Sequence, residues 1–175
     1  MNKQIELSVI ISLTDSVKYG NIPELYKSYK ENLDLTGLNY EFIYVTDSNS
    51  ENALKELSDM YENDENIEII KLGRWFGEAT ALNAGVEQAK SSLILNLPAF
   101  RQVDEKEIPK FINSLQDADM LIANRLRKKD NFMHRFQSKI FHSMVKMAMG
   151  VNYKDLGCKV RLFKKEILDK TNIYE

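Results

Sequence analysis

The sequence is poor in cysteine and in long apolar runs. Its one cysteine, Cys158, excludes an internal disulfide and favours a reducing compartment. A helix that spans a bilayer needs about 20 consecutive apolar residues, and no stretch of this chain approaches that length. The apolar run nearest the N-terminus, Leu7–Leu13, is too short and too poor in basic neighbours for a signal peptide. The sequence therefore predicts a soluble or membrane-peripheral protein.

Two nucleotide-binding fingerprints are also missing. The first apolar run is not followed by Gly-x-Gly-x-x-Gly, and Gly-Lys-Ser and Gly-Lys-Thr do not occur. These absences argue against a Rossmann dehydrogenase and against a P-loop enzyme. The two histidines, His134 and His142, have no acidic or cysteine partner at a ligand spacing, so neither is predicted to bind a metal.

The chain has the composition of one globular domain. Hydrophobic residues make up 43% and charged residues 29% of its 175 positions, and a chain of this size buries about 70% of the surface that it exposes when unfolded. The net charge of −2 hides an uneven distribution. Between positions 120 and 165 only Asp130 and Asp155 are acidic, whereas the basic residues there are Arg125, Arg127, Lys128, Lys129, Arg135, Lys139, Lys146, Lys154, Lys159, Arg161, Lys164 and Lys165. This split points to an anionic partner for the second half.

Apolar runs alternate with amphipathic stretches along the chain. Five runs are predicted as strands, namely Leu7–Leu13, residues 40–46, Ile67–Leu72, residues 92–97 and residues 120–123. Helices are predicted between them, beginning near Pro23, Glu51, Glu78 and Asp104. A longer amphipathic helix is predicted over residues 132–149, with a basic face that is either solvated or attached to anionic lipid. Strands and helices in this alternation predict an α/β fold with a parallel sheet.

The residues that follow the predicted strands form the candidate site, because ligands of parallel α/β sheets bind outside the carboxyl ends of the strands. These strand exits are residues 12–15, 46–49, 73–77, 97–101 and 124–127.

The exit of the third strand carries the clearest signal. Gly73 and Gly77 lie between Leu72 and a helix whose small residues, Ala81, Ala84 and Gly85, allow it to lie close to a sheet. The face of this helix that is predicted to be buried comprises Ala79, Leu82, Val86 and Ala89. A glycine turn that opens into a helix presents backbone N–H groups and the positive end of a helix dipole, to which phosphates bind well. An ordinary connection between a strand and a helix has the same pattern, and on the pattern alone it is the favoured interpretation.

Four motifs follow one another in the chain at these exits and beyond. They are Val45-Thr46-Asp47-Ser48-Asn49-Ser50, Arg74-Trp75-Phe76-Gly77, Ala123-Asn124-Arg125 and Asp155-Leu156-Gly157-Cys158-Lys159-Val160-Arg161-Leu162-Phe163. Their order and spacing resemble those of the family 2 glycosyltransferases, particularly the polyprenyl-phosphate branch that includes dolichol-phosphate mannose synthase. The resemblance runs from Leu7 to Leu168, and the last motif is its most distinctive part.

The resemblance implies the GT-A fold, a Rossmann-like α/β arrangement with a mostly parallel central sheet flanked by helices. It implies transfer of a sugar from a nucleotide-diphosphate sugar to an acceptor such as a polyprenyl phosphate. We expect a single glycosyltransferase-like domain over residues 1–175, either minimal or truncated on its C-terminal side, since relatives usually continue past the last motif. The expected partners are a nucleotide sugar and an anionic lipid or polyprenyl phosphate, without nucleic acid, and the expected location is the cytoplasm, at the inner face of a membrane.

The resemblance also implies roles for single residues in binding the donor. Asp47 matches the aspartate that accepts a hydrogen bond from a nucleobase N–H, a role that suits a carboxylate. Asp15, Arg74, Gly77 and Arg101 are the further candidates for contact with the nucleotide sugar. For Arg74 and Arg101, the alternative is that both are ordinary surface arginines.

Arg125, Arg127 and Asp155 are the candidate catalytic residues. The planar guanidinium group of arginine matches two phosphate oxygens at once, and the family uses basic residues in this region for phosphate groups. Asp155 and Arg161 would equally suit a structural ion pair. Cys158 is more typical of a small buried apolar residue than of a nucleophile.

One family motif is missing from the chain. After the fourth strand the family carries Asp-x-Asp, which holds the donor diphosphate through Mg²⁺ or Mn²⁺, and here Pro98-Ala99-Phe100 stands in its place without an oxygen ligand on any side chain. Asp117-Ala118-Asp119 fits the letters but precedes the fifth strand and is predicted as a solvated turn. Two hypotheses follow. Either Arg74 and Arg101 replace the metal, or the chain is an inactive relative that acts as a nucleotide-, protein- or membrane-binding module.

Overall fold

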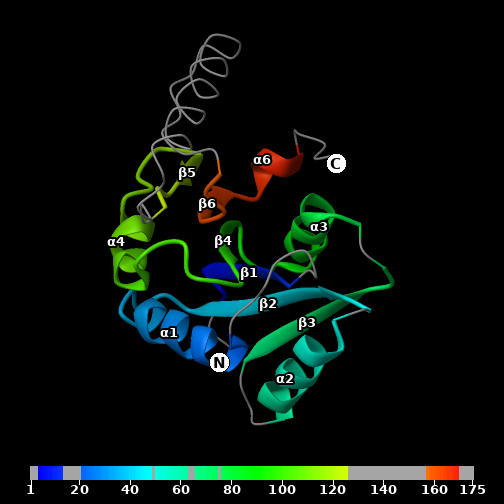
Figure 1. Ribbon diagram of the computed structural model, residues 1–175. Coiled ribbons are helices and arrows are strands. Elements are labelled where there is room, and N and C mark those ends of the chain that lie inside the picture. The colour runs from blue at the N-terminus through cyan, green and yellow to red at the C-terminus, as the bar shows by residue number, and fades with distance from the viewer. Residues whose placement is uncertain are drawn as a thin grey trace, which may run out of the picture.

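The structure, a computed structural model, describes residues 4–13, 21–48, 50–62, 66–74, 76–125 and 157–169. At its centre is a sheet with the strand order β3-β2-β1-β4-β6-β5 (Figure 1). The strands are β1 (Leu7–Leu13), β2 (Tyr40–Asp47), β3 (Ile67–Leu72), β4 (Leu93–Pro98), β5 (Met120–Ile122) and β6 (Arg161–Lys164). The helices are α1 (Ile22–Asp34), α2 (Glu51–Glu62), α3 (Glu78–Gln88), α4 (Ile108–Asn113) and α6 (Glu166–Asp169), with a 3-10 turn, η1 (Glu105–Glu107), before α4.

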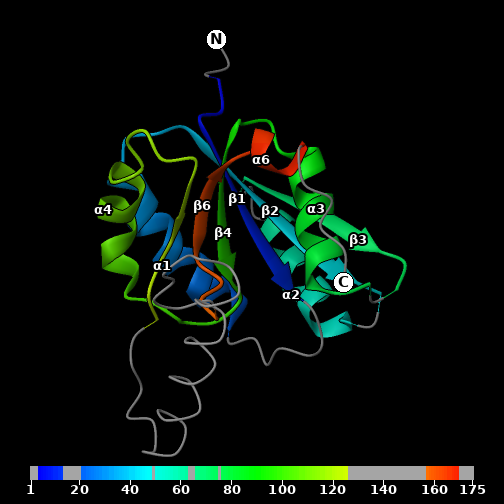
Figure 2. The same cartoon turned by 90° about the horizontal axis from the view of Figure 1, so that it is seen from above.

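Helices cover both faces of the sheet. Figure 2 shows α1 and α4 on one side of the strands and α3 on the other. Successive residues of β1 alternate between the two apolar clusters, so that Val9 and Ile11 pack with α1, α2 and α4 while Ile10 packs with α3. All three side chains are at most 1% exposed. Burial on both faces is what the continuous apolar run of this strand predicts.

The five strands predicted from the sequence are all present, and they run in one direction. β1 pairs in parallel with β2 and with β4, and β2 pairs in parallel with β3. The prediction missed β6, which lies between β4 and β5 and is antiparallel to both. This strand has only four residues, of which Leu162 and Phe163 are buried, so its local pattern is too short to indicate a strand. The mostly parallel α/β class is confirmed.

α1 is tied to the end of β4. The Asn21 side chain caps the helix by accepting a hydrogen bond of 2.9 Å from the backbone N–H of Glu24, and Pro23 occupies the first turn. Further along, the hydroxyl of Tyr29 donates a hydrogen bond of 3.0 Å to the carbonyl of Pro98. Burial raises the pKa of Tyr29, so this hydroxyl keeps its proton and remains a donor. The exit of β4 is thereby held against α1.

α3 lies unusually close to the sheet. A Cβ atom added to Gly85 would come within 2.7 Å of Cγ2 of Ile10 and within 3.3 Å of Cγ2 of Val45, so only glycine fits there. The buried residues of α3 are Ala81, Leu82, Gly85 and Val86. The predicted buried face was therefore partly wrong, because the small side chains of Ala81 and Gly85 form its centre and Ala79 is only half-buried.

The described helices are all too short or too polar to cross a bilayer. The long amphipathic helix predicted over residues 132–149 lies outside the described residues.

Candidate functional site

The exits of β1, β2, β3 and β4 lie side by side at one edge of the sheet, which we call the carboxyl edge. The strand register places Ser12 beside Pro98 and Val45, and Asp47 beside Leu72. The hydroxyl of Ser48 donates a hydrogen bond of 2.7 Å to the carbonyl of Gly73, which joins the loops after β2 and β3. The carboxyl edge therefore brings the first four predicted strand exits together.

Asp47 is the last residue of β2 and is 1% exposed. Its carboxylate accepts a hydrogen bond of 3.1 Å from the hydroxyl of Ser50, and its backbone carbonyl accepts one of 3.4 Å from the N–H of the same residue. These bonds fix a carboxylate at the start of the loop that leads to α2. Its contact with a nucleobase remains a prediction.

Gly77 forms the N-cap of α3. Its φ of 90° and ψ of 164° lie in a region that is essentially restricted to glycine. It carries no side chain, so no side-chain hydrogen bond caps the first turn, and the positive end of the helix dipole lies at this loop. Arg74, in the preceding loop, is exposed and lies over the ring of Phe76, with Cζ 4.8 Å from the ring centroid.

A small cleft lies at the exit of β4. It is lined by Ser12, Glu78, Asn96, Leu97, Pro98, Ala99, Phe100 and Lys159. The ammonium group of Lys159 lies 2.6 Å from Oε2 of Glu78 and 5.9 Å from the centroid of the Phe100 ring. The hydroxyl oxygen of Ser12 is buried and has no hydrogen-bond partner among the described residues. The cleft thus combines a cation with a buried polar atom.

Arg101 lies beside this cleft but is paired with two carboxylates. Its Nε is 3.0 Å from Oε1 of Glu105, and its Nη2 is 3.3 Å from Oε1 of Glu24. Both pairs draw the guanidinium group towards η1 and α1. The role of Arg101 in donor binding stays a prediction. To bind the donor, its guanidinium group would have to leave both carboxylates.

The motifs after β5 and before β6 meet in space. Gly157 lies against the guanidinium group of Arg125, and a Cβ atom on this glycine would come within 2.6 Å of Nη2. Cys158 is fully buried, as expected for a small apolar residue, and its carbonyl accepts a hydrogen bond of 3.4 Å from Nε of Arg161. The remaining predicted site residues, Asp15, Arg127 and Asp155, lie outside the described residues.

The residues at the exit of β4 do not fit a divalent cation. Ala99 is 3% exposed, and neither Pro98 nor Phe100 offers a ligand. Within the described parts of the chain, no group of three His, Cys, Asp or Glu residues could hold a metal ion. Asp119, from the motif that imitates Asp-x-Asp, directly precedes β5 and pairs at 2.7 Å with Lys164, at the opposite edge of the sheet.

Sequence reasoning missed the pair formed by Lys159 and Glu78. Both residues belong to recognised stretches, since Lys159 occupies a variable position of the last motif and Glu78 opens α3. The available signal was a lysine in the last motif of a chain whose sequence lacks Asp-x-Asp. Only the fold shows that the two side chains meet.

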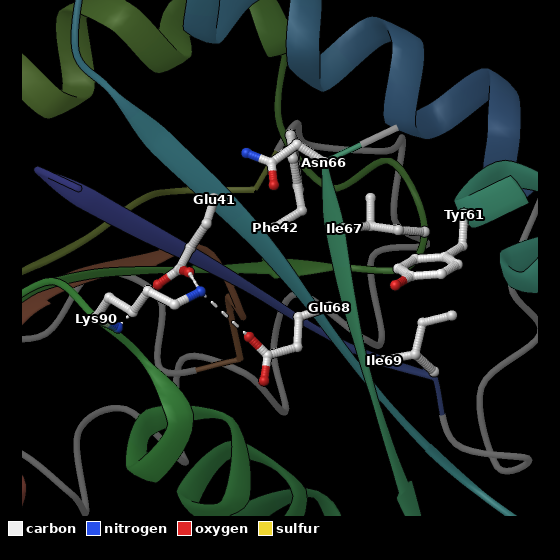
Figure 3. Close-up of a pocket in the computed structure, with 8 residues that line it drawn as sticks. All are labelled: Glu41, Phe42, Tyr61, Asn66, Ile67, Glu68, Ile69 and Lys90. Atoms are coloured by element: carbon white, nitrogen blue, oxygen red, sulfur yellow. Dashed lines mark hydrogen bonds and ion pairs between the residues drawn. The ribbon is translucent and has the colours of Figure 1, made fainter. Parts of the chain in front are cut away.

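A second hollow, with a volume of about 500 Å³, lies at the amino edge of the sheet, where β2 and β3 begin. Figure 3 shows the ammonium group of Lys90 between the carboxylates of Glu41 and Glu68, at 2.7 and 3.5 Å. Tyr61 and Ile67 line the other side. No predicted site residue lies here.

Comparisons with known proteins identify the family of the chain. A family model described as Glycosyl transferase family 2 matches residues 8–171. The undecaprenyl-phosphate 4-deoxy-4-formamido-L-arabinose transferase of Proteus mirabilis (strain HI4320) is 28% identical over 166 residues, which are 94% of this chain and 50% of that protein. The chain thus spans about half the length of the curated relatives that it matches.

Solved structures show the same fold. S. aureus TarS 1-349 in complex with UDP-GlcNAc has a TM-score of 0.59 at 19% identity, over 97% of this chain and 48% of that one. Glucosyl-3-phosphoglycerate synthase from Mycobacterium tuberculosis, in complex with Mn²⁺, UDP and phosphoglyceric acid, has a TM-score of 0.67 at 10% identity, over 93% of this chain and 57% of that one. The predicted GT-A fold is confirmed.

Proposed function

The chain belongs to glycosyl transferase family 2, and from this premise we propose that it transfers a sugar from a nucleotide-diphosphate sugar to a phosphate acceptor. The observation that carries the proposal is the convergence of a buried carboxylate, Asp47, and a helix N-terminus without a side-chain cap, at Gly77, on one edge of the sheet. The carboxylate suits a nucleobase N–H, and the helix N-terminus suits a phosphate.

The chemistry needs no general base from the protein. In the transfer step, an oxygen of the acceptor phosphate forms a bond to the anomeric carbon while the bond from that carbon to the diphosphate oxygen breaks. The electron pair leaves with the nucleoside diphosphate. Because a phosphate acceptor is already anionic at neutral pH, catalysis consists of alignment and of stabilising the charge on the departing diphosphate.

Arginines are the proposed partners of the phosphate groups. Arg125, after β5, and Arg127, two residues further along, would bind phosphate oxygens bidentately. Arg74 is exposed, and its guanidinium group contacts only one aromatic ring in the described contacts, so it remains a candidate for the donor diphosphate. Asp155 is proposed to position these basic groups.

A polyprenyl phosphate is the proposed acceptor. The named function of the Proteus mirabilis relative includes undecaprenyl phosphate, and the basic second half of the present chain suits an anionic lipid surface. We propose that the domain acts at the inner face of a membrane. Co-sedimentation with vesicles containing anionic lipid, compared with vesicles of zwitterionic lipid alone, tests this placement. Equal binding to both would contradict it.

Donor binding is tested by a thermal-shift panel of UDP-, GDP- and dTDP-linked sugars with and without Mn²⁺. A bound donor raises the melting temperature by an amount that grows with the logarithm of the ratio of donor concentration to Kd once the donor is in excess. Asp47→Asn should weaken the selected donor by roughly 10- to 100-fold, because a charge-assisted hydrogen bond is lost. Asp119→Asn, at the opposite edge of the sheet, is the matched control. The absence of any shift, or an unchanged affinity in Asp47→Asn, would overturn the proposal.

The missing Asp-x-Asp motif favours a second candidate, a binding module without turnover. Pro98-Ala99-Phe100 provides no metal ligand. Transfer of radiolabelled sugar to undecaprenyl phosphate separates the two functions, because a binding module would show the thermal shift without any labelled lipid.

A further inference from the structure

The ammonium group of Lys159 lies beside the segment that replaces Asp-x-Asp. It lies over the ring of Phe100, 5.9 Å from the centroid, and Phe100 is the last residue of the segment that replaces Asp-x-Asp. A metal-binding carboxylate is thus replaced by an aromatic face, which attracts an organic cation and not a hydrated divalent one.

The backbone of Lys159 is clamped on both sides. Its N–H donates a hydrogen bond of 2.8 Å to Oε1 of Gln102, and its carbonyl accepts one of 2.9 Å from Nδ2 of Asn96. Both amide side chains are at most 9% exposed, and the flanking residues, Cys158 and Val160, are at most 1% exposed. The fold therefore holds this lysine rigidly beside the end of β4, while its own side chain remains 25% exposed.

The carboxylate that now neutralises Lys159 is replaceable by a ligand. Glu78 opens α3, is 40% exposed, and lies 2.6 Å from the ammonium group. A phosphate that approaches the N-terminus of α3 would meet both the positive end of the helix dipole and the ammonium group. It would compete with Glu78 for Lys159. The buried hydroxyl of Ser12, without a partner among the described residues, lines the same cleft.

Other basic groups are less suited to this role. Arg101 is held by two carboxylates, of Glu24 and Glu105, and Arg74 lies over Phe76 in the loop before α3. Among the described residues, the carboxylate paired with Lys159 is that of the partly exposed Glu78, and Lys159 lines the cleft itself.

We propose that Lys159 replaces the divalent cation of the family in holding the donor diphosphate, so that donor binding by this chain is independent of metal, with Glu78 as a competing anion. The inference rests on the proposed function, since it concerns the same donor. As the bond between the sugar and the diphosphate breaks, the ammonium group offsets the charge that the electron pair brings to the diphosphate oxygen.

Calorimetric titration of the full chain with UDP, GDP and dTDP, and with the corresponding monophosphates, tests the inference. The wild-type chain should bind a diphosphate equally well in EDTA and in Mn²⁺. Lys159→Met should weaken the diphosphate by roughly 10- to 100-fold, because a charge-assisted contact is lost, and should weaken the monophosphate less. Glu78→Gln should strengthen the diphosphate, and Lys159→Arg should retain most of the affinity.

Lys164→Met is the matched control, because it removes a lysine paired with a carboxylate at 2.7 Å from the same region of the chain, at the opposite edge of the sheet. Binding that disappears in EDTA, or an unchanged diphosphate affinity in Lys159→Met, would overturn the inference while leaving the proposed function intact. If Lys159→Met fails to fold, the Glu78→Gln variant tests the inference in its place. Diphosphate binding by Glu78→Gln that is weaker than or equal to that of the wild-type chain would also overturn the inference. A wild-type chain that binds none of the nucleotides or nucleotide sugars would overturn the proposed function and the inference together.

Discussion

Two lysine–glutamate pairs stand at opposite edges of the same sheet. Lys90 and Glu41 meet at 2.7 Å at the amino edge, and Lys159 and Glu78 meet at 2.6 Å at the carboxyl edge. Their distances are alike, but their surroundings differ. Glu41 is 3% exposed and also accepts hydrogen bonds from the hydroxyl of Ser8 and from the backbone N–H of Lys90, both at 2.8 Å, whereas Glu78 is 40% exposed.

The serines of β1 show the same contrast. The hydroxyl oxygen of Ser8, near the amino end, accepts a hydrogen bond of 3.1 Å from the N–H of Ser91 while donating to Glu41. The hydroxyl oxygen of Ser12, near the carboxyl end, is buried without a partner among the described residues, as is that of Thr46 on β2. Buried polar groups are nearly always paired. Among the described residues, the serine hydroxyl at the amino edge is thus paired within the fold, while the serine and threonine hydroxyls at the carboxyl edge are not.

The largest effect on stability is expected at the amino edge. Glu41→Ala leaves the hydroxyl of Ser8 and the backbone N–H of Lys90 without their acceptor, and it should lower the free energy of unfolding by about 2–3 kcal/mol. Glu78→Ala removes a partly exposed pair and a favourable charge in the first turn of α3, so its cost should stay below about 1 kcal/mol. Urea unfolding of both variants measures the difference. Equal losses would show that the two pairs play the same part.

The decrease in the free energy of unfolding at acid pH should also depend on Glu41. Burial raises the pKa of its carboxyl, but hydrogen bonds from the Lys90 side chain, the Lys90 backbone and Ser8 outweigh burial, so the pKa lies below its ordinary value of 4.5. A carboxyl with a lowered pKa in the folded state stabilises the fold above its unfolded pKa, and this contribution is lost as the pH falls through the folded pKa.

Urea unfolding of the wild-type chain between neutral pH and pH values below the ordinary carboxyl pKa measures this contribution. Glu41→Gln cannot titrate at this position, so its stability should fall less steeply on the acid side than that of the wild-type chain. If the free energies of unfolding of the two proteins fell equally steeply with decreasing pH, the assignment of this dependence to Glu41 would be contradicted.

The fold was largely predictable because its strands are local apolar runs. The bounds predicted for Leu7–Leu13 and Ile67–Leu72 agree with β1 and β3. β6 was not predictable in this way, because a four-residue strand is stabilised mainly by its neighbours. Its Leu162 pairs with Leu95 of β4 and Leu121 of β5, and both partners are distant in the sequence.

The candidate site was predictable only where chain order determines position. Asp47 ends β2 and Gly77 lies in the loop between β3 and α3, so the rule on strand ends locates them without coordinates. The pair of Lys159 and Glu78 joins residues 81 positions apart, and its existence depends on how β6 returns beside β4. The carboxylates that hold Arg101 come from α1 and η1 and were likewise invisible to local pattern.

The smallest effect on stability is expected from Ser12→Ala. Comparison with Ser8→Ala, on the same strand, tests the difference between the two edges most directly. The same substitution at Ser8, on the same strand, breaks two hydrogen bonds and leaves the N–H of Ser91 and the carboxylate of Glu41 short of a partner, at a cost of about 1–2 kcal/mol. At Ser12 the hydroxyl has no described partner, so its removal should change the free energy of unfolding by less than about 0.5 kcal/mol.

If the carboxyl edge retains its polar groups for the donor, Ser12→Ala should instead weaken diphosphate binding, and Ser8→Ala should leave that binding unchanged. Equal losses of stability in the two variants, measured by urea unfolding, would mean that the fold itself uses both hydroxyls and that the two edges do not differ.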